Sequence, residues 1–286
     1  MKLSGQATVS SSTDDALNRL IARQFPAASA AGSFSRLDGL TGQAVKVELN
    51  DRTLLARARM PGNPIPGVDR RREHAILRKL AGSGLAPDVC GYNADWLLLA
   101  WQPGETLSSD EFEKRLPMLA ERLVRLHQQP PSGYRLRLLP LLERYWQLSD
   151  PMRRHIAWHR ALRRCRQQGE PHPLRLALLH LDIHAGNLIA HRGDIHLIDW
   201  EYASDGDVAL ELAAIVAGNG LAESYRTQLT LRYATLANMD THRLHQQTER
   251  WLPWVRLLMA SWYERRWQHS GDETFYTLAA EAWQRV

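Results

Sequence analysis

Three oxygen-bearing side chains stand near one another in the middle of the chain. Asp182 precedes Asn187 by five residues, and Asp199 follows at the end of an apolar segment that is interrupted by a turn at 192–194. A hairpin over this stretch would bring the three side chains together. Hard cations such as Mg²⁺ take oxygen ligands, and a protein usually supplies one or two while phosphate and water supply the rest. A carboxylate that is not bound to the metal can orient an attacking hydroxyl group and accept its proton.

Two other interpretations of these residues stay open at this point. Taken singly, an Asp or Asn is about as often a turn residue as a functional one, because its side chain bonds the neighbouring backbone. His180, Asp182 and His184 alternate along the chain, so an extended segment would place all three on one face, as a zinc site requires. A zinc site would leave Asn187 and Asp199 without a role, which makes it the weaker alternative. We expect His180 and His184 to brace the loop by hydrogen bonds and to transfer no proton.

The order of these residues resembles the catalytic segment of kinases. The stretches HLDIHAGN and LIDWEYA are similar to the catalytic pattern of the aminoglycoside phosphotransferase and choline kinase superfamily. The resemblance implies that Asp182 is the catalytic base and that Asn187 and Asp199 are magnesium ligands. It also implies an α+β, protein-kinase-like bilobal fold, with a small N-terminal lobe of mainly antiparallel sheet and a larger, mostly helical C-terminal lobe.

The first hundred residues are expected to form mainly sheet, with helices packed against it. Alternating apolar residues predict strands, and apolar residues at helical spacing predict helices. The expected segments are a helix that ends before Pro26, strands over 45–49 and 54–60, a helix over about 69–80, and a buried strand over 95–101. We place the end of this lobe at residue 101, so that the predicted domains are 1–101 and 102–286.

Beyond residue 101 the apolar residues recur mainly at the helical period. A line of them over 112–126 predicts one long helix, which Pro117 is expected to bend. Asp207 is expected to cap a further helix that begins near Val208. The exception to this helical pattern is 178–200, which predicts a strand, a turn and a second strand around the candidate site.

The resemblance implies that the small lobe binds ATP. Gly39 and Gly42 would let the backbone approach the phosphates, although an ordinary turn between strands explains them equally well. The chain contains no Gly-Lys pair, which excludes a Walker A loop. Backbone groups at Trp101 and Gln102, where the predicted lobes join, are expected to bind adenine.

An arginine stands where kinases usually carry the phosphate-binding lysine. Arg57 occupies that place on the predicted third strand, and its guanidinium group offers two parallel donors to a phosphate. Glu73, on the following helix, is the expected partner of Arg57. The alternative for Glu73 is an ordinary solvated carboxylate on a helix surface.

Several stretches of the large lobe resemble the bacterial thiamine kinases. They are 138–147, 173–176, the hairpin segment described above, 205–213 and the tryptophan-rich segment 250–267. This resemblance implies ATP-dependent phosphorylation of the hydroxyethyl group of thiamine to thiamine phosphate, a salvage reaction. Thiamine carries a cationic thiazolium ring, which a good aromatic contact stabilises by about 0.5–2 kcal/mol. Five of the ten tryptophans fall within the last 36 residues and could line the acceptor pocket, although helix packing is the commoner role of any one of them.

Choline, an aminoglycoside or another small alcohol would use the same catalytic residues, so these acceptors remain the alternative. A catalytically silent nucleotide-binding module and a nucleic-acid binder are rivals of other classes. The net charge, 36 − 31 = +5, is too dilute to indicate nucleic acid by itself. Two cysteines without metal-type spacing fit a reducing compartment, and the N-terminal stretch lacks the apolar core of a secretion signal. We therefore expect a cytoplasmic enzyme without nucleic-acid or membrane partners.

Overall fold

The computed structural model describes residues 10–26, 33–37, 44–59 and 65–286 of the chain. The chain divides into two compact units. We call residues 1–62 and 74–103 the sheet unit, and residues 63–73 and 104–286 the helical unit. The division falls inside helix α2 (Arg70–Lys79), so the first turn of this helix belongs to the helical unit and its remainder to the sheet unit.

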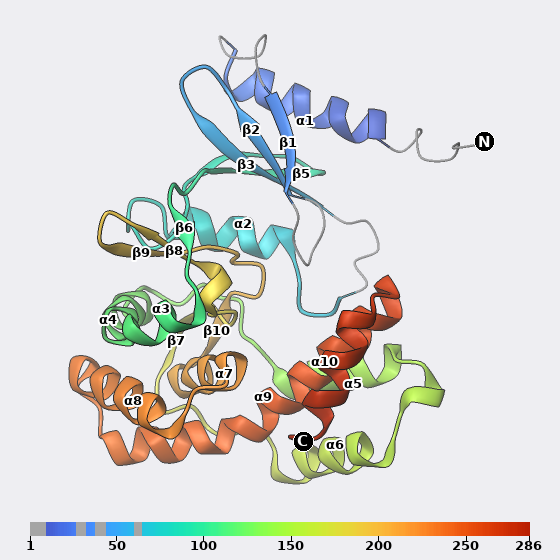
Figure 1. Ribbon diagram of the computed structural model, residues 1–286, viewed down its shortest axis with the longest axis vertical. Helices are drawn as coiled ribbons and strands as arrows, with labels where there is room; N and C mark the ends of the chain where they lie inside the picture. Colours follow the sequence, from blue (N-terminus) through green and yellow to red (C-terminus); the bar gives the residue numbers. More distant parts are fainter. Residues whose placement is uncertain (1–9, 27–32, 38–43, 60–64) are drawn as a thin grey trace. The chain divides into compact units, whose positions relative to one another are not determined.

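The sheet unit is an antiparallel sheet with helix α1 across one face (Figure 1). Its strands are ordered β1-β2-β3-β5-β4. The elements are α1 (Ser10–Gln24), β1 (Ser33–Leu37), β2 (Ala44–Glu48), β3 (Thr53–Ala58), β4 (Val89–Tyr92) and β5 (Trp96–Ala100). The strands predicted over 45–49, 54–60 and 95–101 are therefore present as β2, β3 and β5. Strand β4 was not predicted, because a short segment that contains a glycine carries little alternation.

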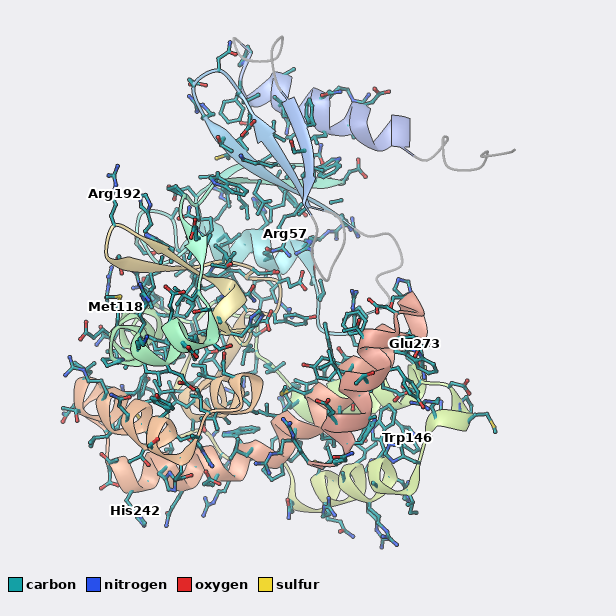
Figure 2. The ribbon with its side chains drawn as sticks, in the orientation of Figure 1. Arg57, Met118, Trp146, Arg192, His242 and Glu273 are labelled. Atoms are coloured by element: carbon teal, nitrogen blue, oxygen red, sulfur yellow. The ribbon has the colours of Figure 1, made fainter. Side chains whose placement is uncertain are left out.

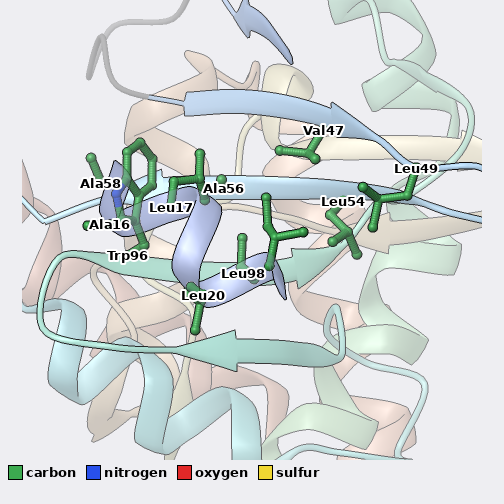
Figure 3. Packing of buried hydrophobic residues seen from close by; sticks show 11 residues of the cluster. Ala16, Leu17, Leu20, Val47, Leu49, Leu54, Ala56, Ala58, Trp96 and Leu98 are labelled. Carbon is green, nitrogen blue, oxygen red and sulfur yellow. The ribbon is translucent and has the colours of Figure 1, made fainter. Parts of the chain in front are cut away.

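Apolar side chains of α1 pack against the inner face of this sheet (Figure 3). Leu17 and Leu20 of α1 are each 2% exposed, and Leu54, Ala56 and Leu98 of the sheet are buried with them. Burying one leucine side chain stabilises a fold by about 1.5–3 kcal/mol. Side chains alternate along a strand, so this packing turns the odd-numbered residues of β3 to the face away from α1.

The helical unit combines two small sheets with a set of packed helices (Figure 1). One sheet has the order β6-β8-β9, and the other pairs β10 with β7. Its strands are β6 (Glu105–Thr106), β7 (Leu176–Leu179), β8 (Leu188–His191), β9 (Asp194–Leu197) and β10 (Ser204–Asp207). Its helices include α3 (Ser109–Lys114), α4 (Leu116–His127), α5 (Leu138–Leu148), α6 (Ile156–Gln168), α7 (Val208–Asn219), α8 (Glu223–Ala237), α9 (Thr241–Ser270) and α10 (Glu273–Trp283), with short 3₁₀ turns at Pro151–Arg153 and Ala185–Asn187.

The prediction of one bent helix over 112–126 is wrong. The chain forms two helices, α3 and α4, because Arg115 between them leaves the helical conformation with φ −99° and ψ 7°. Pro117 stands in the first turn of α4. A proline lacks the N–H that a helix interior requires, but the first turn leaves such groups unpaired in any case. The proline therefore begins a new helix.

Helix α7 is buried on most sides and packs against α9. The prediction that Asp207 caps it is confirmed, because the Asp207 side chain accepts a hydrogen bond from the Ala209 backbone N–H. The helix ends at Gly220, whose φ of 60° is a conformation that glycine adopts without steric cost. Within the described ranges, no helix combines the length and the apolarity that a membrane crossing needs.

Candidate active site

The predicted hairpin is present in the helical unit and positions two of the candidate residues. Strands β8 and β9 pair in register, with Leu188 opposite Leu197, and the Ile198 N–H continues the ladder by donating to the Asn187 carbonyl over 3.1 Å. Asn187 and Asp199 therefore lie at the same end of the hairpin. Arg192, in the turn at the opposite end, extends away from this site (Figure 2).

The structure brings Asp182 and Asn187 into direct contact. The Asn187 amide nitrogen donates to the Asp182 backbone carbonyl and to its carboxylate Oδ2, each over 2.9 Å. Both donor positions of the amide are thereby committed, and its oxygen is directed to the other side. Asp199 stands two residues after the end of β9 with a φ of 65°, a left-handed conformation that Asp tolerates better than most residues. Asp182 and Asp199 are both partly exposed, as a site that meets a ligand requires.

Metal binding by these residues is chemically reasonable for Mg²⁺. The Asn187 amide oxygen and the Asp199 carboxylate are hard oxygen donors, and a magnesium site takes only one or two of these from the protein. The zinc alternative finds no support, because the described ranges contain no group of three or more His, Cys, Asp or Glu side chains that could hold a metal. The donor set therefore fits magnesium better than zinc.

His180 braces the segment that carries Asp182, as predicted. Its ring is fully buried, its Nε2 lies 2.9 Å from the Ile198 carbonyl, and its Nδ1 accepts from the Asp182 backbone N–H over 3.3 Å. A neutral ring satisfies both contacts, with its proton on Nε2. Burial lowers the pKa of His180, which keeps the ring neutral. His180 thus ties the backbone of Asp182 to the residue that precedes Asp199. His184 makes a longer contact, 3.9 Å from Nε2 to Asp182 Oδ1.

Glu211 of α7 is a further supporting residue, which sequence reasoning missed. Its carboxylate is 0% exposed and accepts the backbone N–H groups of His180 and Leu181, each over 2.7 Å. Leu181 has a φ of 69°, which is unfavourable for a leucine. Burial alone would raise the pKa of Glu211, but the contacts with His127 and His180 lower it overall. The signal in the sequence was a single acid inside an apolar stretch.

Three aromatic side chains, Tyr202, Trp262 and Tyr263, form a connected group in the helical unit. Trp262 donates from Nε1 to the Tyr202 hydroxyl over 2.7 Å, and its ring meets the Tyr263 ring edge-on at 5.3 Å between centroids. Burial raises the pKa of Tyr202 and of Tyr263, and the Asp182 carboxylate adds to both shifts. All three rings are partly buried. Trp251, by contrast, is buried and bonds to the capping Asp207, so its role is packing.

Other predicted ligand residues lie in the sheet unit. Arg57 of β3 is 5% exposed and lies on the face turned away from α1 (Figure 2), where Leu97 is its neighbour across the ladder. The Trp101 N–H donates to the Thr53 carbonyl over 3.2 Å, and the Gln102 amide lies 3.5 Å from the Ala100 carbonyl. Gly39 and Gly42 fall outside the described residues.

Glu73 is not a solvated surface carboxylate. It is 0% exposed and belongs, with the first turn of α2, to the helical unit. Arg70 is its partner within this unit, with Nη1 2.5 Å from Glu73 Oε2. The second nitrogen of the same guanidinium group, Nη2, lies 3.0 Å from Glu201 Oε2. The expected pairing of Glu73 with Arg57 joins residues of two units and stays a prediction.

Comparison with known proteins identifies the family of this chain. Residues 34–245 match the model of the phosphotransferase enzyme family. The chain is 42% identical over 272 residues to the thiamine kinase of Escherichia coli O139:H28 (strain E24377A / ETEC), covering 94% of each chain. The fold is similar to that of the choline kinase LicA from Streptococcus pneumoniae, with a TM-score of 0.77, 16% identity, and coverage of 96% of this chain and 100% of that one. LicA in complex with AMP gives a TM-score of 0.72 at 16% identity, with 95% and 98% of the two chains covered. The α+β kinase-like fold is thereby confirmed, and the chain belongs to the phosphotransferase enzyme family.

Proposed function

We propose that this protein is a thiamine kinase, which transfers the terminal phosphoryl group of ATP to the hydroxyethyl group of thiamine and so forms thiamine phosphate. The acceptor is supported by 42% identity to thiamine kinase over 94% of the chain. The reaction type is supported by one observation above all, the Asp182–Asn187 contact beside Asp199. In this proposal the Asp182 carboxylate can accept a proton, and Asn187 and Asp199, at the same end of the hairpin, offer oxygen donors to a metal.

In this proposal, Asp182 orients the acceptor hydroxyl by accepting its hydrogen bond and then takes its proton. Asn187 holds the Asp182 carboxylate through Oδ2, and His180 fixes the backbone of the same residue. Asn187 and Asp199 would hold Mg²⁺, which when bound neutralises phosphate charge. Positioning and charge neutralisation supply most of the rate in phosphoryl transfer, so rigid support of these side chains is central.

We assign nucleotide binding to the N-terminal lobe, residues 1–101, and acceptor binding to residues 102–286. Arg57 is proposed to bind the ATP phosphates and Glu73 to brace it. The backbone at Trp101 and Gln102 is proposed to bind adenine, and Gly39 and Gly42 to approach the phosphates. Nucleotide use is supported by the AMP complex of the choline kinase LicA.

The aromatic group of Tyr202, Trp262 and Tyr263 is proposed to line the acceptor site. Its closeness to Asp182 supports this assignment, since the acceptor must present its hydroxyl group to that carboxylate. A thiazolium cation gains from aromatic faces and from a nearby negative charge. Choline is also a cation, so the similarity of fold to choline kinases makes choline the second candidate. We place the reaction in the cytoplasm, because Cys90 and Cys165 are both free thiols.

The decisive experiment incubates the protein with MgATP and thiamine and identifies the product by mass. We expect thiamine monophosphate and ADP, with much slower turnover of choline and of an aminoglycoside. Asp182→Asn should lower kcat by roughly 10²–10⁴-fold while circular dichroism stays unchanged, because it removes the proton acceptor. Asp95→Asn, an exposed substitution of the same chemistry, is the matched control. Thiamine diphosphate as product, faster turnover of choline, or full activity of Asp182→Asn would contradict the proposal.

A further inference from the structure

Arg70 joins two buried carboxylates within the helical unit. Its side chain is 12% exposed, whereas those of Glu73 and Glu201 are 0% and 2% exposed. The guanidinium group meets Glu73 at 2.5 Å through Nη1 and Glu201 at 3.0 Å through Nη2. Arg72 adds a contact to the same place, because its Nη2 donates to the Glu201 backbone carbonyl over 3.0 Å and also to the Gly67 carbonyl. Two arginines in the first turn of α2 therefore hold Glu201 by its side chain and by its backbone.

Glu201 follows the proposed magnesium ligand Asp199 by two residues. Trp200, between them, is 1% exposed and donates from Nε1 to the Leu197 carbonyl over 3.1 Å. On the other side of Asp199, the Ile198 carbonyl lies 2.9 Å from His180 Nε2. The short segment around Asp199 is thus anchored at both ends, toward the catalytic loop by His180 and toward α2 by Arg70.

The shape of the guanidinium group explains why arginine suits this place. Its planar fork directs separate N–H groups at two different carboxylates, while the ammonium group of lysine is a compact point charge. The two carboxylates are nearly fully buried, so each depends on a close cation or donor for its charge to be tolerated. Loss of Arg70 would therefore disturb both acids together and change the distance between them.

We propose that Arg70 is a positioning residue for nucleotide use: it holds Glu73 and the segment of Asp199 in one fixed arrangement. The inference rests on the proposed function, in which Glu73 braces the phosphate-binding Arg57 and Asp199 binds magnesium. It adds a link that couples these two roles. A residue that couples them affects the binding of MgATP more than the binding of the acceptor.

The test compares Arg70→Gln and Arg70→Lys with Arg71→Gln, whose side chain is exposed on the same turn. We expect Arg70→Gln to raise KM for MgATP about tenfold, which corresponds to 1.4 kcal/mol. KM for thiamine should rise less than KM for MgATP, because Arg70 reaches the proposed acceptor site only through Glu201, the neighbour of Tyr202. KM for MgATP of Arg70→Lys should lie between the values of Arg70→Gln and the unchanged protein, and that of Arg71→Gln should equal the value of the unchanged protein. In the double variant Arg70→Gln/Glu201→Gln, the effect on KM for MgATP should be smaller than the sum of the single effects, because both substitutions break the same Arg70–Glu201 pair.

Several results would overturn the inference. An unchanged KM for MgATP in folded Arg70→Gln would do so, and so would equal effects on both KM values. If Arg70→Gln does not fold, Arg70→Lys decides the question by the same KM comparison. Failure of the proposed function is a separate outcome, seen when the unchanged protein does not phosphorylate thiamine. Calorimetric titration with MgATP then tests Arg70 without any acceptor, and equal affinities of Arg70→Gln and the unchanged protein would refute the inference.

Discussion

Replacing Glu211 by glutamine should weaken the hydrogen bonds that hold the backbone just before Asp182. The two carboxylate oxygens of Glu211 accept one backbone N–H each, from His180 and from Leu181, over 2.7 Å. Glutamine has nearly the same shape but only one acceptor oxygen. Its NH₂ group would face a second N–H donor, so one backbone donor would stay buried and unsatisfied.

The size of the effect follows from these two bonds. An unsatisfied buried donor costs about 1–3 kcal/mol, and replacing a charged acceptor by a neutral one costs about 1 kcal/mol at the other bond. We therefore expect Glu211→Gln to lower the free energy of unfolding by about 2–4 kcal/mol. Leu181 adds to the consequence, because a left-handed conformation costs a leucine roughly 1–2 kcal/mol. Without its second anchor the backbone can relax toward a normal conformation, and Asp182 moves with it.

Activity should respond more strongly than the overall fold. A displacement of about 1 Å at a catalytic group can cost about 100-fold in rate, so kcat should fall by roughly that factor. Urea unfolding followed by circular dichroism measures the stability, and a coupled assay of ADP release measures the rate. Glu223→Gln, at an exposed position in α8, is the matched control and should change neither.

Acid titration separates the role of the Glu211 charge from its role in packing. The pKa of Glu211 lies below its ordinary value of 4.5 in the folded protein, so the carboxylate contributes its full stabilisation above about pH 4.5. This contribution is lost as the pH falls through the folded-state pKa. The difference in stability between the unchanged protein and Glu211→Gln should therefore narrow as the pH falls below about 4.5. A difference that does not depend on pH, or wild-type stability and rate in Glu211→Gln, would refute the reasoning.

Two further predictions concern the C-terminal helices. Arg153→Gln should lower the free energy of unfolding in urea by about 3 kcal/mol, because it removes both ion-pair contacts, 2.7 and 3.1 Å, from the fully buried carboxylate of Glu264; an unchanged unfolding curve would contradict this. Trp262→Phe removes the hydrogen bond to Tyr202 and a strong aromatic face, so steady-state kinetics should show KM for thiamine raised about threefold to tenfold. An equal rise of KM for MgATP would instead indicate a general loss of structure.

The sequence was informative where a pattern is local. Alternation of apolar residues predicted β2 and β3, because one face of each strand packs on a core, and a continuous apolar run predicted the buried strand β5. The turn at 192–194 between two apolar runs predicted the hairpin that positions Asn187 and Asp199, since such a pattern leaves few other arrangements. Helix boundaries were less secure, and the break between α3 and α4 was missed because a proline that bends a helix and one that starts a helix look alike in sequence.

The supports of the site were not predictable in the same way. Glu211 lies 30 residues from Leu181 in the chain, and Glu201 lies far in sequence from Arg70, so no short spacing connects them. Their importance comes from burial, which only the fold determines. A carboxylate in an apolar helix and a glutamate after a tryptophan each had an ordinary interpretation until the structure showed which backbone groups and cations they meet.

Strain and support occur together in the catalytic segment. Leu181 and Asp199 both have left-handed backbone conformations, with φ of 69° and 65°. Leu181 directly precedes the proposed base Asp182, and Asp199 is itself a proposed magnesium ligand. Such conformations persist only where the surroundings hold them. Glu211 holds Leu181 by accepting its backbone N–H. Asp199 is held from both sides, because His180 contacts the Ile198 carbonyl before it and Arg70 contacts the Glu201 carboxylate after it. Removing any one of the three should therefore release a strained residue toward a relaxed conformation, and each loss should reduce turnover more than it reduces stability.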